Sequence, residues 1–395
     1  MTSRPTVILL HCRYRERGGE DEVFAAELDL LRSHGWAPLP VVLEPADVAT
    51  LRGRLRTGLQ AVWSREWAAR IGRLCRQTRA KIVHVHNYFP TLSPAVFRAC
   101  AEAGVPVVHT LHNYRICCPN ALLLREGRPC HACVGKRFAW PGVVHGCYHG
   151  SRAETAAVAA ISGVHRAMGT WTGKVDGYIA LSEFSRRTFI EAGLPEEKIF
   201  VKPNFHAPDL GPGDENGGFV LFAGRLADYK GVMTMLEAWE GVDRRIRLLV
   251  AGDGPLAGAV GKAVRDRPNI EWLGRRSKGE VLTLMKRATA LIHPSLSYEN
   301  FPLAIVEAFA TGLPVIASRR GAAAELVEHG RTGRLCAAGQ SESLAAEVNW
   351  IHSHPRARAA MRSAARAEYL EKYTAEKNYQ RLMEIYGRVM ENGGS

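Results

Sequence analysis

Two carboxylates in an apolar stretch are the side chains best placed to do chemistry in this chain of 395 residues. Glu299 and Glu307 are separated by seven residues, six of them apolar. An apolar helix does not need a carboxylate at Glu307, and burying one without a polar partner is costly. If the helix begins near Phe301, Glu299 lies at its positive N-terminal end, and Glu307 lies about two turns, roughly 10 Å, further along. The spacing predicts an anion site between two hydrogen-bond acceptors, which suits a nucleotide-sugar.

Two cations precede this segment and could bind the anion. Arg225 and Lys230 follow a strand-like run, Phe219–Ala223, and a tight turn at Gly224. At the carboxyl end of a parallel strand, a bidentate Arg and the point charge of a Lys can hold a pyrophosphate. The alternative is a pair of exposed loop cations without a ligand. Two more strands that end in glycine turns, at 250–255 and 269–274, favour the pyrophosphate site.

The elements that position these residues alternate between buried-type strands and helical patterns, which is typical of parallel α/β proteins. In the first half we expect strands at Val7–His11, Pro40–Leu43, Ile82–His86, Val105–Leu111, Gly177–Leu181 and Ile199–Lys202. In the second half we expect strands at Phe219–Ala223, Arg247–Ala251, Ile270–Leu273, Ala290–His293 and Val315–Ser318.

The domain organisation predicted from this pattern has two doubly wound domains. The first spans 1–205, the loop 206–218 links the two, and the second spans 219–373. The tail is helical from about Leu344, with a break at Pro355. A last segment, 374–395, has an apolar stripe at helical spacing and must dock on another surface.

The motifs of the second half resemble family 4 (group 1) of the retaining glycosyltransferases, which have the GT-B fold. The resemblance covers nearly the whole C-terminal half. It rests on an ordered set: Ala223-Gly224-Arg225 with Lys230-Gly231, Gly252-Asp253-Gly254-Pro255, Glu299 to Glu307, Gly312-Leu313-Pro314-Val315, and Gly321. It implies an α/β protein whose two Rossmann-like domains face a central cleft, with the last helix crossing back onto the first domain.

By position, the resemblance implies that Arg225 and Lys230 hold the donor pyrophosphate. Glu299 would contact the transferred sugar, and Glu307 the ribose hydroxyls. The other implied donor-binding residues are Gly18, Gly19, Gly224, Gly254, Asn300, Phe301, Pro302 and Leu303. Many members have glycine at the position of Pro302, which has no amide hydrogen to donate, so contacts there must come from its neighbours.

In the first half, His112 matches the family's histidine at the end of a strand, near the transferred sugar. His109 lies within the same strand and is the more structural of the two. His84 and His86 end another strand and are expected to point toward the cleft, one of them facing only the sheet. Gly18 and Gly19 resemble the family's glycine loop, where a backbone amide approaches the donor phosphate. The neighbouring Arg13, Arg15 and Arg17 could bind a phosphorylated acceptor.

The family's retaining mechanism implies catalysis without a metal cofactor and without a covalent intermediate. The leaving phosphate takes the acceptor's proton, while the enzyme supplies positioning and charge stabilisation. The implied catalytic residues are His112, Glu299, Arg225 and Lys230. Glu299 as a covalent nucleophile remains the alternative. A sugar-phosphate synthase, a phosphorylase, a transferase for a small acceptor and a catalytically silent binding subunit are the other function classes.

An insert at 113–150 interrupts the α/β pattern and holds five of the nine cysteines. Cys130 and Cys133 form a C-x-x-C motif, with Cys118 twelve residues before it and Cys147 fourteen after it. These four thiols could close a structural zinc site. Buried structural thiols and a redox or disulfide pair are the alternatives. The spacing of a nucleic-acid-binding finger is not found, so we expect no nucleic-acid partner.

The net charge is +13, and residues 1–205 carry +10 of it, with 27 Lys and Arg against 17 Asp and Glu. A basic first half predicts an anionic partner, although general solvation by Arg is the alternative. Within 51–81, nine basic residues accompany Trp63 and Trp67. This segment suits an acidic membrane surface that delivers a lipid-linked glycan acceptor, or else it is an ordinary surface helix. Since neither a signal peptide nor a membrane span is seen, we expect a cytoplasmic protein, peripheral on the inner face of the membrane.

Overall fold

The computed structural model describes residues 4–14, 18–44, 58 and 60–392. The chain divides into two compact units, which are considered separately. Unit 1 comprises residues up to Leu123, Cys130–Pro203 and the chain from Asn378 onward. Unit 2 comprises Leu124–Pro129 and Asn204–Lys377.

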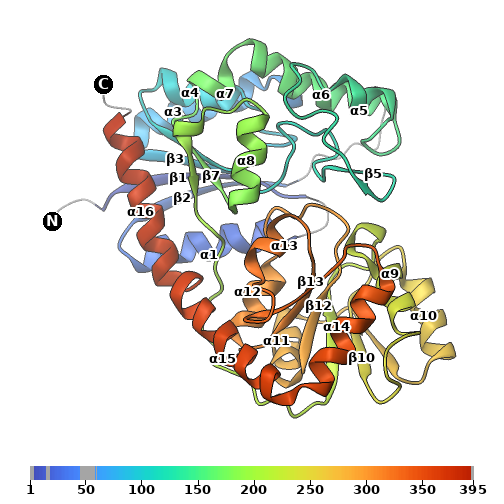
Figure 1. Cartoon of the computed structure of the whole chain (residues 1–395). Coiled ribbons are helices and arrows are strands. Elements are labelled where there is room, and N and C mark those ends of the chain that lie inside the picture. The colour runs from blue at the N-terminus through green and yellow to red at the C-terminus, as the bar shows by residue number, and fades with distance from the viewer. Residues whose placement is uncertain (1–3, 15–17, 45–57, 59, 393–395) are drawn as a thin grey trace. The chain divides into compact units, whose positions relative to one another are not determined.

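Unit 1 is built on a six-stranded parallel sheet of order β2-β1-β3-β4-β7-β8 (Figure 1). Its strands are β1 (Thr6–Cys12), β2 (Ala37–Leu43), β3 (Ile82–Asn87), β4 (Val107–Thr110), β7 (Gly177–Ala180) and β8 (Ile199–Val201). The order reverses between β1 and β3, and ligands of doubly wound folds bind at the carboxyl ends of the strands at such a switch point. The edge strand β2 accommodates Pro38 and Pro40, which an interior strand would not.

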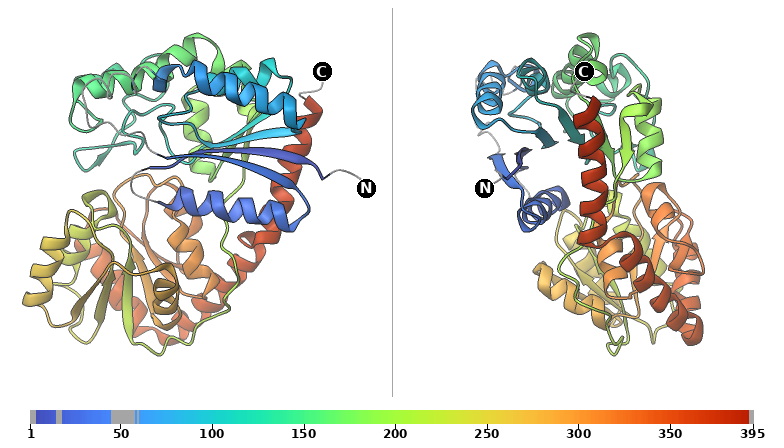
Figure 2. Two further views of the ribbon diagram at one scale, coloured as in Figure 1. Left: turned by 180° about the vertical axis from the view of Figure 1, so that it is seen from behind. Right: turned by 90° about the vertical axis from the view of Figure 1, so that its left-hand side faces the viewer.

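Helices cover both faces of this sheet. The helices are α1 (Gly19–Ser33), α3 (Arg65–Thr78), α4 (Ala95–Glu102), α5 (Trp140–Val144), α6 (Arg152–Ala167), α7 (Thr170–Gly173), α8 (Glu183–Glu191), the short η1 (Glu196–Lys198) and α16 (Ala375–Asn392). Figure 2 shows α1 on one side of the sheet and α3 with α4 on the other. Within unit 1, α16 packs against the turn between α1 and β2, because Tyr379 stacks on His34 and Tyr386 packs on Trp36.

Unit 2 has a second six-stranded parallel sheet, of order β11-β10-β9-β12-β13-β14. Its strands are β9 (Phe219–Ala223), β10 (Arg247–Ala251), β11 (Ile270–Gly274), β12 (Ala290–His293), β13 (Val315–Ser318) and β14 (Gly333–Cys336). Its helices are η2 (Asp228–Lys230), α9 (Val232–Ala238), α10 (Ala257–Asp266), α11 (Lys278–Arg287), α12 (Leu303–Ala310), α13 (Gly321–Leu326), α14 (Ser341–Ser353) and α15 (Pro355–Lys372). A two-stranded hairpin, β5 (Leu124–Arg125) with β6 (Arg128–Pro129), completes the strands.

The two faces of the second sheet bury separate apolar cores. Alternate residues of β9 point to opposite sides, so Leu221 joins the core beneath α11, α12 and α15, while Val220 and Phe222 join the core beneath α9, α10 and α14. A strand that is buried on both faces reads as a continuous apolar run, which explains why these strands could be located from the sequence. The order reverses between β9 and β12, and this switch point is the expected ligand position.

Candidate functional site

The switch point of unit 2 carries both predicted cations. Gly224 and Arg225 follow β9, and the turn η2 ends at Lys230. Arg225 is exposed and Lys230 is half-buried. Gly231 has a φ of +72°, and a Cβ there would lie 1.9 Å from the carbonyl oxygen of Pro294. Only glycine allows this contact, which fixes Lys230 against the loop that follows β12.

That loop places a carboxylate against Lys230. Lys230 Nζ lies 2.9 Å and His293 Nε2 3.1 Å from Glu299 Oε1, and 15% of the Glu299 side chain is exposed. Burial alone would raise the pKa of Glu299, but Lys230 and His293 hold it well below its ordinary value. Glu299 is therefore a charged hydrogen-bond acceptor at neutral pH. The sequence predicted Lys230 and Glu299 as separate contacts and missed both their ion pair and His293.

Helix α12 begins at Leu303, two residues after the approximate start predicted from the sequence. Pro302 is the N-cap residue, in an extended conformation. A proline fits there because the first amides of a helix have no intrahelical acceptor, and its missing donor costs little. Asn300 and Pro302 are buried, while Phe301 and Leu303 are half-buried.

Glu307 is buried within α12 and forms an ion pair with Lys278, the first residue of α11. A lysine therefore meets the carboxylate that the apolar helix did not require. The sequence predicted that Glu307 needs a polar partner, but it did not identify Lys278, which is 29 residues away.

The glycine turns after β9 and β10 pack against one another. A Cβ at Gly254 would lie 2.6 Å from the carbonyl oxygen of Leu226, and one at Gly252 only 1.9 Å from that of Gly224. A Cβ at Gly224 itself would meet no atom closer than 3.7 Å. Packing within unit 2 therefore explains Gly254, whereas Gly224 leaves open space at the end of β9.

In unit 1, the predicted glycine loop lies at the start of α1. The amide of Gly18 donates to Asp21 Oδ2 at 2.9 Å, and the amide of Asp21 donates to the carbonyl oxygen of Gly18 at 3.1 Å. The first turn of α1 carries three acids, Glu20, Asp21 and Glu22. Asp21 therefore already occupies the Gly18 amide that was predicted to approach the donor phosphate. Of the predicted arginines, Arg13 pairs with Glu44 Oε1 at 2.6 Å, and Arg15 and Arg17 lie outside the described residues.

His112 follows β4 and lines a pocket that opens to solvent. Its Nε2 lies 3.0 Å from Nδ1 of His86, and the two ring planes are inclined to each other by only 22°. Burial, and next the neighbouring His86, hold the pKa of His112 well below its ordinary value. In a neutral His112, one ring nitrogen donates a hydrogen bond and the other accepts one, so the ring can contact a sugar hydroxyl.

The other predicted histidines are buried in the sheet. His109 Nδ1 lies 2.9 Å from the carbonyl oxygen of Val85, and burial lowers its pKa to about 4. His84 and His86 are also buried. Burial, and next His84, lower the pKa of His86 to about 3, so it is neutral at physiological pH.

Sequence reasoning missed a polar group beside this pocket. Arg115 lines it, with its guanidinium over the ring of Phe89. Glu20 accepts a hydrogen bond from Asn87 Nδ2 at 3.1 Å, and burial raises the pKa of Glu20 to about 8. The two asparagines Asn87 and Asn113 also line the pocket. No motif drew attention to these residues, because they come from three separate elements.

Cys133 interacts electrostatically with the three other predicted zinc ligands, but the described thiols do not form a group close enough to share an ion. Burial raises the pKa of the Cys133 thiol to about 11, and the thiols of Cys118, Cys147 and Cys130 act on it in the same direction. A Cβ at Gly142 would lie 3.4 Å from Cys133 Sγ, and the amide of Cys147 donates to the carbonyl of Gly142. All nine cysteines are free thiols. Among the described residues, the group of three side chains spaced to share an ion is instead Glu27, His84 and His86. Zinc at the cysteines stays a prediction.

The basic segment 51–81 lies partly outside the described residues. Within its described part, α3 exposes Arg65, Arg70 and Arg73. Trp63 stacks on His165 at 5.5 Å, and Trp67 lies beneath Arg70. Both tryptophans thus have partners in unit 1. No helix in the described part of the chain is long and apolar enough to span a bilayer.

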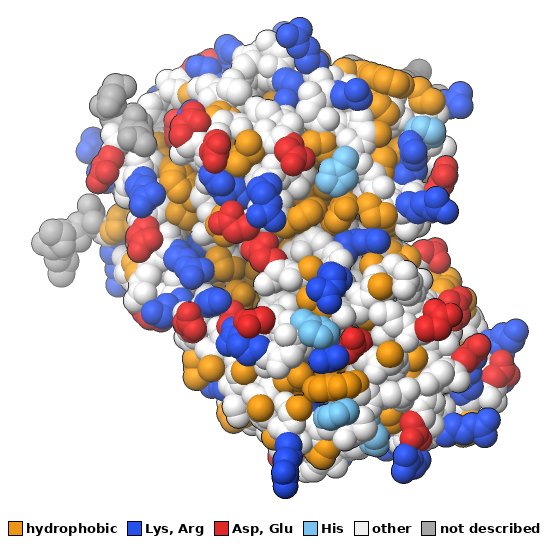
Figure 3. All heavy atoms as spheres, in the orientation of Figure 1, with side chains coloured by type: hydrophobic (Ala, Val, Ile, Leu, Met, Phe, Trp, Pro, Cys, Tyr) orange, Lys and Arg blue, Asp and Glu red, His pale blue; other side chains and the backbone are white. Residues whose placement is uncertain are grey.

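Exposed apolar side chains occur instead in and after the insert. Trp140 and Val144 of α5 are 55% and 51% exposed, and Phe138 beside them is 42% exposed. Figure 3 shows hydrophobic side chains gathered at the upper right of the view, over the part of unit 1 that holds α5 and α6, with Lys and Arg beside them. Elsewhere on this face, basic and acidic side chains are interspersed.

Comparison with known proteins matches both halves of the chain to families. The model described as "Glycosyltransferase Family 4" matches residues 6–209, and the model described as "Glycosyl transferases group 1" matches residues 211–368. The phosphatidyl-myo-inositol mannosyltransferase of Mycobacterium leprae (strain TN) is 27% identical over 317 residues, which is 78% of this chain and 80% of that protein.

Solved structures match the fold over nearly the whole chain. HepE of Anabaena in complex with UDP has a TM-score of 0.68 at 19% identity, covering 95% of this chain and 98% of that one. Sucrose-phosphate synthase of Thermosynechococcus elongatus has a TM-score of 0.71 at 14% identity, covering 98% and 100%. At these identities the likeness shows the fold alone. The predicted GT-B fold of two parallel-sheet α/β domains is confirmed.

Proposed function

Because the chain belongs to glycosyltransferase family 4, we propose that it moves a sugar from a UDP- or GDP-sugar to a glycan acceptor carried on a lipid. We propose that the anomeric configuration is retained. The observation that carries this proposal is the charged Glu299, held between Lys230 and His293 beside the start of α12 at the switch point of unit 2. This arrangement combines an acceptor for sugar hydroxyls with donors for phosphate.

The donor would occupy the carboxyl end of β9 and β12. Arg225 and Lys230 would hold the pyrophosphate, with the first amides of α12 facing the phosphate and the sugar. Glu299 would accept from the sugar and Glu307 from the ribose. Gly224 would allow close approach of the ligand, since a Cβ there meets no atom closer than 3.7 Å.

Catalysis in this proposal consists of positioning and charge stabilisation. The leaving phosphate would accept the proton of the attacking hydroxyl on the same face of the sugar, so the chain need supply neither a base nor a metal ion. Lys230, Arg225 and the N-terminus of α12 would stabilise the charge that grows on the phosphate. His112 would bind a sugar hydroxyl.

The acceptor assignment is supported by two features. One relative is a phosphatidyl-myo-inositol mannosyltransferase, whose name gives it a lipid acceptor. The apolar patch of Phe138, Trp140 and Val144, with exposed Lys136 and Arg137 beside it, has the aromatic and basic character of a surface for acidic lipid. We therefore assign membrane contact to this patch and a position on the cytoplasmic face of the membrane.

A donor panel tests the transfer activity. Purified protein is incubated with UDP- and GDP-sugars, a lipid extract and EDTA, and the released nucleoside diphosphate and the anomeric configuration of the product are measured. Release that depends on the extract, with a retained anomer and no effect of EDTA, is expected. Inversion of the anomer would instead identify an inverting enzyme. Formation of sugar 1-phosphate from a glycan and inorganic phosphate, without release of nucleoside diphosphate, would identify a phosphorylase.

Flotation on liposomes tests the membrane patch. The wild type is expected to float with vesicles that contain acidic lipid, and Trp140→Ala is expected to bind less. Met233→Ala, which removes an exposed apolar side chain of unit 2, is the control and should bind as the wild type does. If Trp140→Ala binds to the acidic vesicles as well as Met233→Ala does, the membrane contact does not involve this patch.

A further inference from the structure

A buried carboxylate in unit 1 has no part in the function proposed above. Glu27 lies in the middle of α1, on the face that also buries Phe24 and Leu31, and is 1% exposed. Burial alone would raise the pKa of Glu27, but Lys202, His84 and His86 hold it well below its ordinary value. Glu27 is therefore a permanent negative charge inside unit 1, and a charge in that position needs partners.

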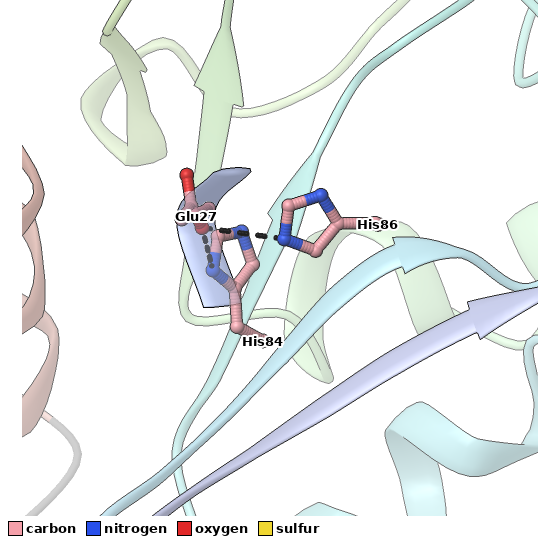
Figure 4. A group of neighbouring side chains, drawn as sticks. All are labelled: Glu27, His84 and His86. Atoms are coloured by element: carbon pink, nitrogen blue, oxygen red, sulfur yellow. Dashed lines mark ion pairs between the residues drawn. The ribbon is translucent and has the colours of Figure 1, made fainter. Parts of the chain in front are cut away.

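The partners of Glu27 come from three elements. Lys202 Nζ lies 2.9 Å from Oε2, and Lys202 also donates to Asn378 Oδ1 of α16 at 3.0 Å. On the other side, His84 Nδ1 lies 2.9 Å and His86 Nε2 3.2 Å from Oε1. Figure 4 shows both imidazoles, from β3, directed at the same carboxylate oxygen.

The side chains of Glu27, His84 and His86 are also spaced to share a metal ion. However, the positive charge of Lys202 makes the binding of a metal ion there unfavourable. A buried ammonium group already neutralises the carboxylate, so a divalent cation would add uncompensated positive charge in a buried site. Tyr386 OH lies 2.8 Å from His84 Nδ1, and Thr110 Oγ1 lies 2.7 Å from His84 Nε2. Both nitrogens of His84 thus have protein partners.

The positions of the protons follow from these contacts. Glu27 Oε1 and His86 Nε2 lie 3.2 Å apart without the geometry of a full hydrogen bond, but the negative charge of the carboxylate favours the tautomer of His86 that carries its proton on this nearer nitrogen, Nε2. His86 is neutral, and its Nδ1 is then an acceptor. The group opposite this Nδ1 is Nε2 of His112, 3.0 Å away, which must donate. The proton of a neutral His112 therefore sits on Nε2, and its Nδ1 is left as an acceptor.

We propose that Glu27 is a positioning residue for His112, which acts through His86 to fix the tautomer and the orientation of the ring beside the sugar. This inference rests on the proposed function, in which His112 binds a sugar hydroxyl. Nδ1 of His112 would accept the hydrogen of that hydroxyl. Lys202 and Asn378 keep the carboxylate charged, and thereby connect α16 to the same network.

The test is Glu27→Gln in the full chain. In this variant the amide oxygen of the new side chain would face Lys202, and its NH₂ group would face His86. The donor and the acceptor would then exchange roles in the contact between residue 27 and His86 and in the contact between His86 and His112. His86 would then donate from Nδ1, and His112 would carry its proton on Nδ1 in place of Nε2. The tautomer is measured by ¹⁵N NMR of histidine-labelled protein, with the His112 signal assigned from His112→Gln. Asp29→Asn, the same change on the exposed side of α1, is the control.

In Glu27→Gln, we expect the His112 tautomer to switch and kcat to fall roughly 10- to 100-fold, as for other supporting hydrogen-bond partners, with little change in the KM of the donor. Asp29→Asn should change neither. If Lys202, left without its carboxylate, prevents folding, the double variant Glu27→Gln with Lys202→Met removes the unpaired charge and serves instead.

An unchanged tautomer in a folded Glu27 variant would overturn the proposal, as would a stoichiometric metal that survives Cys133→Ser and is lost in Glu27→Gln. The tautomer is measured on the protein without substrate. A switched tautomer in a protein that transfers no sugar would therefore refute the proposed function and leave the relay standing.

Discussion

Glu299 and Glu27 solve the same physical problem in the two units. Each is a carboxylate in apolar surroundings, and each is kept charged by one lysine together with one or two histidines. A carboxylate held in this way is a fixed acceptor with a defined geometry. We infer that Glu299 uses this property on the donor, whereas Glu27 uses it on other side chains.

The charge of Glu299 predicts a dependence of stability on pH. Because its folded pKa lies well below the ordinary 4.5, its ion pair stabilises the fold above pH 4.5 and loses this contribution as the pH falls through the folded value. Glu299→Gln should therefore lower the free energy of unfolding at neutral pH, by about 2 kcal/mol for a charged hydrogen bond. Urea unfolding of both proteins from pH 7 to pH 3 measures the difference.

The difference should narrow as the pH falls below 4.5. A difference in the free energy of unfolding that stays constant over this range would mean that the contribution of Glu299 to stability does not depend on its charge. Glu237→Gln, which changes an exposed carboxylate of α9, is the control outside this ion pair.

Glu307 provides a second prediction at this scale. Its partner Lys278 is 41% exposed, so water can solvate that lysine when the carboxylate is removed. Glu307→Gln should therefore fold with little loss of stability but bind nucleoside diphosphate less tightly, because a neutral amide is a weaker acceptor for the ribose hydroxyls. Calorimetry with UDP and GDP measures this affinity. Equal affinity in a folded variant would remove Glu307 from the donor site.

At the scale of elements, the sequence located the sheet but not the partners of its polar residues. The observed bounds of β9, β10, β12 and β13 coincide with the predicted ones, because strands buried on both faces are continuous apolar runs. The short β14 was missed, since Gly333-Arg-Leu-Cys336 carries too little apolar signal. The start of α12 lies two residues after the approximate one predicted, because Pro302 acts as its N-cap.

The site could be predicted only as far as local motifs reach. Glu299, Lys230 and His112 stand at strand ends, and a pattern can identify such positions. Lys278, His293 and Lys202 are partners brought in by the fold, and no local spacing reveals them. The buried face of α1 did carry one usable signal, a carboxylate between apolar residues, which is the signal that identified Glu307.

The cysteine insert gives a prediction for an element. If Cys133 and the thiols of Cys118, Cys130 and Cys147 bind zinc, purified protein should contain about one zinc per chain, and Cys133→Ser should lose it and unfold at lower temperature. Cys336→Ala, which removes a buried thiol of unit 2, should keep the metal. Metal analysis and thermal unfolding measure both quantities. Zinc-free wild type, purified without chelator, would favour buried structural thiols.

At the scale of the molecule, the sheet of each unit has one switch point, and the side chains at the two switch points differ in charge. The cations and the ionised carboxylate of unit 2 suit a nucleotide-sugar. The switch point of unit 1 presents three acids at the start of α1, and its neutral histidines lie near the pocket at the end of β4. In the proposed function, the charged donor would therefore bind to unit 2 and unit 1 would contact sugar hydroxyls. The net charge of +13 adds an attraction to anionic partners.

The central claim, that the donor phosphates bind at Lys230 in unit 2, is tested most directly by calorimetric titration of the full chain with UDP and GDP. We predict that one of the two nucleotides binds the wild type and that Lys230→Ala weakens this binding roughly 10-fold or more, as expected for a lost charge-assisted contact. Lys262→Ala, which removes an exposed lysine of α10, should leave the affinity unchanged. Equal affinity of the wild type and a folded Lys230→Ala variant would contradict the account.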